Sequence, residues 1–433
     1  MLRKLITIVF ILMICQSSRA QFLMDMVDTS KDIGKGMLSI YQKFDRIKIS
    51  GYIQPQFQLA QTKGAKSFGG GDFSEKVNNR FSLRRGRIKF EYVHFAESSG
   101  PSVQFVFQFD GTERGVFIRD FWGRIFENKF QLFSFTAGMF ARPFSYELNL
   151  SSSDRESPER GRMSQLLMKT ERDLGVMLSL DPRKNGHPWR FFKLDAGLFN
   201  GQGLSAVGDF DSHKDFITRA SLKPVNISKK IVLSTAVSYF SGGFLQNTRY
   251  IYSTKNLNGV KSYGVDSAIT NEGKIAPRQY YGADMQVKFK TTAGFLELRA
   301  EFMAGKQTAS HLTSETPAAL LTGTDGYYIR KFNGAYFYLL CNIFNSHHQL
   351  GVKYDWYDPN TMVSKNEIGQ AGTNFNAADI KYSTLGFGYN YYMNANVKLL
   401  LWYDIVENEK TSLPGYGSDL KDDILTCRLQ FRF

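Results

Sequence analysis

The sequence predicts an all-β fold: one closed antiparallel transmembrane β-barrel of about sixteen strands, with long external loops, over residues 46–433. Three observations lead to this prediction. The N-terminus carries an export signal, apolar and polar residues alternate along one segment after another up to Phe433, and the connections between these segments are alternately long and short.

Residues 1–20 are expected to be a secretory signal peptide. Arg3 and Lys4 form a basic start, positions 5–15 are almost wholly apolar, and Ala20 ends a Ser-Arg-Ala stretch suited to cleavage. A lipid anchor on Cys15 is the weaker alternative, because Ile14 is bulky where such signals carry a small residue. Cleavage removes three cations and lowers the net charge from +14 to +11.

The composition favours a barrel over other exported folds. No stretch after the signal peptide holds eighteen consecutive apolar residues, which excludes spanning helices. Cys341 and Cys427 are the only cysteines left, too few for a disulfide scaffold, and we expect them to lie too far apart to bond. The chain is rich in Phe (37), Tyr (22) and Gly (38), and a closed barrel is the one non-helical way to pair every backbone group inside a bilayer.

Residues 21–45 precede the first predicted strand. Met26, Ile33, Met37, Ile40 and Phe44 recur at helical spacing, which predicts a short amphipathic helix. We expect this segment to be a periplasmic lead-in to the barrel. The alternative is a plug inside the lumen.

From residue 46 the period of the pattern becomes two. In the first segment Ile47, Ile49 and Ile53 alternate with polar residues, and in a membrane barrel the apolar face meets lipid while the polar face lines water. Sixteen segments follow this pattern: 46–60, 80–95, 102–110, 115–126, 130–141, 172–180, 189–199, 215–223, 231–240, 279–290, 293–304, 332–344, 347–357, 380–392, 395–407 and 422–433.

The connections between these segments differ in length. Seven of the eight odd-numbered connections, such as 61–79, 142–171 and 241–278, are long, and all the even-numbered ones are short. Outer-membrane barrels have short periplasmic turns and long external loops, so both termini are predicted in the periplasm.

The last segment, 422–433, is amphipathic and ends on an aromatic residue. It resembles the C-terminal signal that barrel-assembly machinery reads. The predicted location is therefore the bacterial outer membrane, in contact with its lipid and lipopolysaccharide.

Several short stretches resemble the phosphate-selective porin O and P family. They are Arg80–Phe90, Gly138–Phe144, Arg172–Val176, Phe199–Gly201, Tyr281–Met285 and Tyr354–Asn360. The resemblance implies a homotrimeric porin of sixteen strands whose third external loop folds inward and narrows the channel. It also implies selection of phosphate or polyphosphate by lumenal arginines and lysines, although no individual selectivity residue of the family is carried over onto this chain.

The period of two assigns basic side chains to the lumen. Ile88 and Phe90 on the second strand, with Phe216 and Leu222 on the eighth, are placed toward lipid, so their neighbours face inward. The candidate anion path consists of Arg85, Arg87, Lys89, Arg219, Lys223, Lys288 and Lys353. The same rule turns Arg299, Lys398 and Arg428 inward, together with the acids Asp284, Glu297, Glu301, Asp355 and Asp404. Any one of these cations could therefore be half of a structural ion pair.

The step from Arg84 to Gly86 breaks the alternation of the second strand and predicts a β-bulge. The third long connection, 142–171, is the candidate constriction loop, and its basic residues are Arg142, Arg155, Arg160 and Arg162. Four acids in the same loop argue against a simple positive plug. The planar fork of an arginine nevertheless suits the oxygen atoms of phosphate.

The sequence gives no sign of an enzyme, a metal site or a cofactor. The six histidines lie in or beside connections, without a Gly-x-Ser-x-Gly motif or metal-ligand spacing. Trp189, Tyr391 and Tyr392 near the periplasmic edge, with Tyr354 and Trp356 near the outer edge, fit an aromatic girdle. The positive charges are spread along alternate strand positions, which argues against nucleic-acid binding.

The surplus of positive charge predicts passive diffusion of small anionic solutes, including phosphate or polyphosphate, through a lumen lined by Arg and Lys. Two alternatives stay open. One is a general diffusion porin with only a weak anion preference, and the other is a barrel whose loops form a surface binding or adhesion module.

Overall fold

The structure is a computed structural model, and it describes residues 46–96, 100–206, 208–257, 259–322 and 325–433. The predicted signal peptide and the amphipathic helix expected over 21–45 lie outside these residues. No helix in the described part of the chain is long and apolar enough to cross a membrane.

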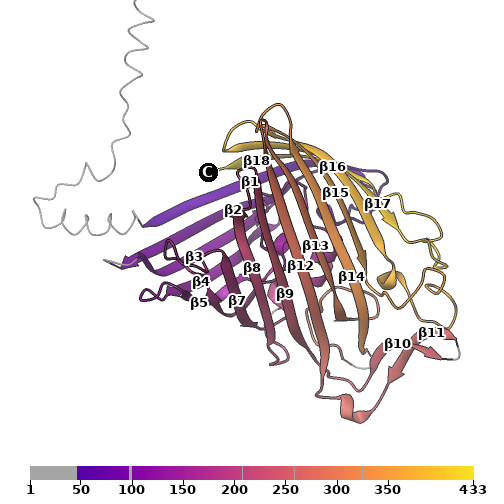
Figure 1. The fold of residues 1–433 in the computed structure, drawn as a ribbon. Coiled ribbons are helices and arrows are strands. Elements are labelled where there is room, and N and C mark those ends of the chain that lie inside the picture. The colour runs from indigo at the N-terminus through magenta and orange to yellow at the C-terminus, as the bar shows by residue number, and fades with distance from the viewer. Residues whose placement is uncertain (1–45, 97–99, 207, 258, 323–324) are drawn as a thin grey trace, which may run out of the picture.

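Sixteen strands form one closed antiparallel barrel (Figure 1). β1 pairs with both β2 and β18, which closes the sheet. The strands are β1 (Ile47–Ala60), β2 (Asn79–Ala96), β3 (Gly100–Thr112), β4 (Gly115–Phe126), β5 (Phe133–Ala141), β6 (Arg172–Leu180), β7 (Phe192–Phe199), β8 (Asp215–Asn226), β9 (Ile231–Leu245), β12 (Ile275–Thr291), β13 (Gly294–Ala309), β14 (Tyr327–Asn342), β15 (His348–Asp358), β16 (Tyr382–Tyr392), β17 (Val397–Asn408) and β18 (Ile424–Arg432). The closed sixteen-stranded barrel is confirmed, and the predicted strand ends differ from these by at most five residues.

One hairpin was not predicted. The connection 241–278 was expected to be a loop, but it contains β10 (Ile251–Leu257) and β11 (Val260–Asp266). Since β9 pairs directly with β12, this hairpin stands outside the barrel wall, and only Ile251–Ser253 pair with β14, in parallel. Its position depends on contacts with other external loops, which a local pattern does not reveal.

The two faces of the wall differ in polarity, as the alternation predicts. Large apolar side chains such as Ile88, Phe337 and Val352 are exposed on the outside, whereas polar ones such as Gln58 and Arg428 are buried inside. This is the reverse of a soluble protein and suits a wall surrounded by lipid. The barrel is therefore built to lie in an outer membrane.

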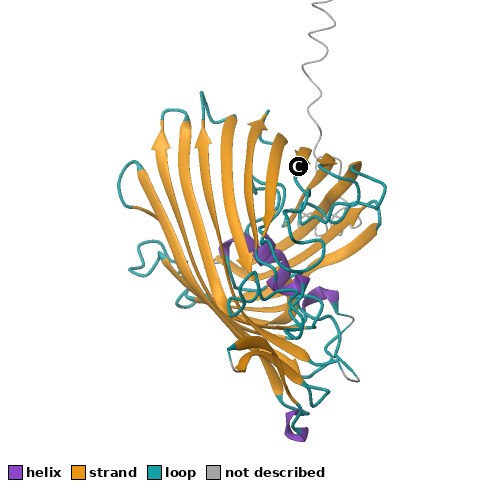
Figure 2. Ribbon diagram, turned by 90° about the vertical axis from the view of Figure 1, so that its right-hand side faces the viewer, coloured by secondary structure: helices purple, strands orange, loops and turns teal. Residues whose placement is uncertain are grey.

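Connection lengths alternate around the barrel. Figure 2 shows short turns along one end of the sheet and long loops at the other. The third long connection runs from β5 to β6 and holds two short helices, α3 (Tyr146–Asn149) and α4 (Arg162–Leu167), which lie inside the barrel (Figure 2).

Candidate functional site

The third loop, residues 142–171, fills much of the lumen. Its apolar residues Phe144, Leu148, Met163 and Leu167 are buried against inward side chains of the strands, among them Phe240, Tyr280, Phe332 and Tyr357. An aqueous lumen would leave such side chains wet, so burying them against the wall stabilises the inward position of the loop.

Polar wall side chains fix the middle of this loop. Its backbone carbonyl oxygens accept hydrogen bonds from four strands of the wall, β1, β16, β17 and β18. The contacts are Gln54 with Ser152, Lys398 with Ser153 and Arg155, Gln430 with Ser153, Asn390 with Glu156, and Arg428 with Pro158. These strands are consecutive neighbours, so the contacts hold the middle of the loop against one side of the wall.

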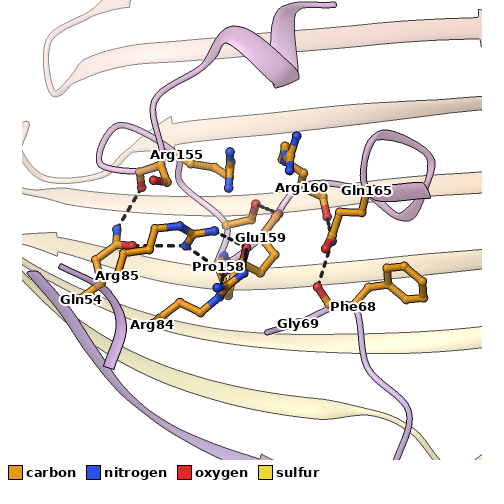
Figure 3. A network of polar contacts seen from close by, with 12 residues as sticks. Gln54, Phe68, Gly69, Arg84, Arg85, Arg155, Pro158, Glu159, Arg160 and Gln165 are labelled. Carbon is orange, nitrogen blue, oxygen red and sulfur yellow. Dashed lines mark hydrogen bonds and ion pairs between the residues drawn. The ribbon is translucent and has the colours of Figure 1, made fainter. Parts of the chain in front are cut away.

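Glu159 is the centre of a charge cluster at this level (Figure 3). Arg85 and Arg428 donate to its carboxylate at 2.6 and 2.9 Å, and Arg84 donates to it at 2.9 Å. Although burial raises the pKa of Glu159, the fields of Arg84, Arg85 and Arg428 hold it well below its usual range. One carboxylate thus forms ion pairs with three guanidinium groups.

The bulge predicted in β2 explains how two consecutive arginines reach Glu159. Gly86 pairs with Ile53 and Leu83 with Pro55, so Arg84 and Arg85 together oppose Gln54. The β-bulge is confirmed. An extra residue re-aims the side chain next to it, and Arg84 consequently joins Arg85 inside instead of facing lipid.

A second bulge brings in an arginine that the sequence analysis missed. In β4 the register shifts at Arg119, because Asp120 pairs with Gln108 and Ile118 with Phe109. Arg119 donates to Glu171 and lies 3.8 Å from Asp110. The sequence does contain a signal for this bulge: the charged pair Arg119–Asp120 comes directly after the apolar run Val116–Ile118. The pair Arg84–Arg85 marks the bulge of β2 in the same way.

Arginines outnumber carboxylates in the ion-pair network on the side of the third loop that faces β2, β4 and β6. Glu171 is shared by Arg119, Arg160 and Arg172, Asp110 by Arg87 and Arg119, and Asp120 pairs with Arg172. With the Glu159 cluster, seven arginines (Arg84, Arg85, Arg87, Arg119, Arg160, Arg172 and Arg428) share four carboxylates. The side of the lumen formed by β2, β4 and β6 therefore carries a surplus of positive charge, whereas near β13 two carboxylates, Glu156 and Glu297, share Arg299.

Each of the seven residues of the candidate anion path makes an ion pair. The pairs are Arg85–Glu159, Arg87–Asp110, Lys89–Glu91, Arg219–Asp284, Lys223–Asp181, Lys288–Glu297 and Lys353–Asp355. Only some of these seven residues lie close to one another. Arg85 and Arg87 lie beside the third loop, whereas Lys223 and Lys288 lie toward the short-turn ends of β8 and β12. An anion path along all seven stays a prediction.

The four arginines of the candidate constriction loop have different surroundings. Arg142 anchors the base of the loop on the carbonyl oxygens of Thr170 and Gly201. Arg162 stacks between the rings of Phe68 and Tyr382, 4.3 and 3.5 Å from their centroids.

Arg155 and Arg160 hold free hydrogen-bond donors. Arg155 is 3% exposed, and its Nε and Nη1 have no partner among the described residues; the same is true of Nη1 of Arg160. Both side chains extend into the lumen above Glu159 in the view of Figure 3. Buried donors without a partner are costly, so these groups favour an anionic or polar occupant.

Water-sized space remains on both sides of the third loop. A cavity of about 880 Å³ on the loop side of the barrel is lined by Arg80, Arg84, Arg114 and residues of the connection 61–79. Toward the short-turn end, a cavity of about 670 Å³ is lined by Lys48, Arg87, Lys89, Arg119 and Arg172. A further one of about 330 Å³ includes Arg124, Lys193 and Arg219. Arginine and lysine side chains thus line the space on both sides of the third loop, together with acids such as Asp72, Glu113 and Asp195.

Cys341 and Cys427, the two cysteines of the described residues, are both free. Within the described residues, no group of His, Cys, Asp and Glu side chains could hold a metal ion.

Searches with protein-family models and among curated proteins found no match. Among solved structures, the outer membrane channel DcaP of Acinetobacter baumannii is similar: it is 12% identical, with 89% of this chain and 97% of that chain covered and a TM-score of 0.52. OmpF of Salmonella typhi, solved in complex with daunomycin, is 9% identical with the same coverage and a TM-score of 0.52. The resemblance to the O and P family is finer than this likeness and stays a prediction. At such identities the likeness concerns the fold, which is that of a porin-like outer-membrane channel.

Proposed function

We propose that this porin-like barrel passes small anionic solutes by passive diffusion, along the arginine-rich side of the lumen formed by β2, β4, β6 and the third loop. The observation that carries the proposal is the ion-pair network on this side of the third loop, in which seven arginines share four carboxylates. Charges around a narrow low-dielectric pore add their fields over distance, so the surplus favours anions even though individual cations are paired.

Phosphate is the solute class that the unpaired donors of Arg155 and Arg160 suit best. A guanidinium group presents N–H groups in a fixed fork that matches phosphate oxygens. Binding must remain weak enough for release, since a tightly held ion blocks conduction.

Planar-bilayer recordings of the purified protein test the proposal. In a tenfold gradient of potassium chloride we expect a reversal potential that indicates chloride over potassium, and added phosphate should lower the chloride conductance. The double variant Arg84→Gln, Arg160→Gln should shift the reversal potential toward cations, because it removes two charges at the constriction. Its control is Lys63→Gln, Lys410→Gln, which removes two exposed charges from the external loops and should leave the potential unchanged.

Two results would replace the proposal by its alternatives. Anion preference that is weak and insensitive to phosphate would indicate a general diffusion porin. A folded protein without any conductance would indicate a surface binding or adhesion barrel.

We also propose a homotrimer, as the resemblance to the O and P family implies, embedded in outer-membrane lipid and lipopolysaccharide after insertion by barrel-assembly machinery. Exposed phenylalanines such as Phe81, Phe107 and Phe135 on β2, β3 and β5 provide an apolar face that suits subunit packing. The mass of the protein in mild detergent tests this, and a monomeric mass would contradict it.

A further inference from the structure

One side of the short-turn rim carries a group of exposed cations. They lie in the turns that follow β4, β6 and β8, and we call them the basic arc: Lys129, Lys184, Arg190, Lys229 and Lys230. β4 to β9 pair in consecutive order, so these turns are neighbours along the rim.

The basic arc lacks acidic partners within the described chain. None of its five residues forms an ion pair there, whereas the nearby inward cations Lys193 and Lys223 pair with Asp195 and Asp181. Glu127, in the first of these turns, accepts the backbone N–H groups of Phe130 and Leu132 at 2.5 and 3.2 Å. Its carboxylate therefore stabilises the turn instead of neutralising the arc.

Among the described short turns, lysine and arginine occur only on this side of the rim. The other three described short turns, 292–293, 343–347 and 393–396, contain Thr, Asn, Ser, His and apolar residues but neither Lys nor Arg. A general need for solubility would distribute charge over all turns. The asymmetry indicates that the arc faces something that the other side does not.

Apolar side chains are interleaved with the arc. Phe130, Trp189 and Ile227 are 60%, 61% and 60% exposed. Nζ of Lys129 lies 5.3 Å from the ring centroid of Phe130, and the guanidinium of Arg190 lies 4.6 Å from that of Phe191. Aromatic rings prefer the headgroup level of a bilayer, and long cationic side chains extend from there to the phosphates.

We propose that the basic arc binds the phosphate groups of anionic phospholipids in the inner leaflet of the outer membrane. The exposed wall below it, including Phe133, Leu178 and Phe192, is the part of the barrel that contacts lipid. The arc and its exposed rings continue directly into the lipid-facing wall, so the same membrane would cover both. This favours a lipid over an acidic periplasmic protein as the partner.

Native mass spectrometry of the full-length exported protein with added phosphatidylglycerol or phosphatidylcholine tests the proposal. We expect the wild type to retain phosphatidylglycerol preferentially, and this retention to fall when the salt concentration is raised, because exposed charges are screened. The arc variant Lys184→Gln, Arg190→Gln, Lys229→Gln, Lys230→Gln should retain at least fivefold less phosphatidylglycerol.

The control variant is Lys63→Gln, Lys365→Gln, Lys410→Gln, Lys421→Gln, which removes four exposed cations at the loop end and should bind as the wild type does. Equal retention of the two lipids by the wild type, as expected for a protein partner, would overturn the proposal. So would an equal loss in both variants. If the arc variant does not fold, the wild type alone tests the proposal: retention of phosphatidylglycerol that does not fall with rising salt would overturn it. The readout is lipid binding, so it is independent of the anion preference proposed above.

Discussion

At the scale of single residues, Glu159 connects the third loop to the wall. Its carboxylate accepts from arginines of β2 and β18, and its side chain is 6% exposed. A buried charge network of this kind stabilises mainly because leaving one member unpaired is expensive. Glu159 also offsets part of the positive surplus at the constriction, so it acts on both stability and selectivity.

Replacing Glu159 by Gln should therefore have two effects. Removing one partner from a buried ion pair costs roughly 3–5 kcal/mol, so the temperature at which the folded band disappears in heat-modifiability gels should fall. The reversal potential should shift further toward anions, because a negative charge leaves the constriction. The control is Glu315→Gln, whose pair with Lys169 is exposed and contributes about 0–1 kcal/mol. Equal behaviour of the two variants would contradict the role given to Glu159.

Asp422, in the external loop before β18, provides a test by pH. Burial raises its pKa to about 6, although Arg162 lowers it. The folded loop then binds a proton that the unfolded loop has already lost, so its stability is highest below the unfolded pKa and falls as the pH rises toward about 6. Hydrogen exchange of residues 409–423, corrected for the intrinsic rate, should show less protection at pH 7.5 than at pH 5. Asp422→Asn should remove this difference, and a wild type protected equally at both values would contradict the assignment.

At the scale of elements, the β10–β11 hairpin belongs to the external loops and not to the barrel. Tyr263 of β11 packs on Tyr328 and Phe375, with ring centroids 4.7 and 4.9 Å away, and its hydroxyl donates to Asp379 at 2.5 Å. Asp379 also pairs with Arg330 at 3.0 Å, and both side chains are fully buried. The hairpin therefore holds the connection 359–381 in place.

Deleting Ile251–Asp266 and joining the ends with a short Gly-Ser linker should leave the barrel folded, because β9 pairs with β12 without the hairpin. Trypsin should then cleave faster after Lys365 in the uncovered loop. Tyr263→Phe, which removes only the hydroxyl, should fall between the wild type and the deletion. A deletion variant that fails to fold would show that the hairpin is needed for the barrel itself.

At the scale of the whole molecule, the barrel has an apolar outer wall and a polar lumen. Phe90 is 37% exposed on the outside and pairs with Phe107, whereas Gln108 on the neighbouring strand faces the lumen and lines the cavity at the short-turn end. These two positions are adjacent, but their environments are lipid and water.

Phe90→Arg should reduce assembly, because an arginine on the lipid face costs roughly 2–4 kcal/mol near mid-membrane. Gln108→Arg introduces the same side chain into the wet lumen and should assemble normally, with a shift of the reversal potential toward anions. The yield of heat-modifiable protein in outer membranes measures the first effect and bilayer recordings measure the second. If the two variants assemble equally well, the assignment of lipid-facing and lumen-facing side chains on β2 and β3 is wrong.

Much of this architecture follows from the sequence alone. Successive side chains of a strand point to opposite faces, so a pattern with a period of two residues identifies a strand. The alternation at positions such as Ile88, Lys89 and Phe90 therefore predicts both the strand and the face of each side chain without any knowledge of contacts. Connection lengths likewise distinguish the two ends of the barrel, because turns and loops are local features. The bulge at Arg84–Arg85 was visible as a break in the same period.

The partners of the lumenal charges depend on the closed fold. Glu159 meets Arg84 at a separation of 75 residues and Arg428 at 269, and the alternation that turns each side chain inward contains no information on which charge it will face. The β10–β11 hairpin escaped prediction for the same reason, since its position depends on Tyr263 packing against Tyr328 of β14 and Phe375 of the connection 359–381, both more than 60 residues away. Period and loop length are one-dimensional properties of the chain, whereas pairing across a lumen exists only once β18 has closed on β1 and the third loop has folded between the walls.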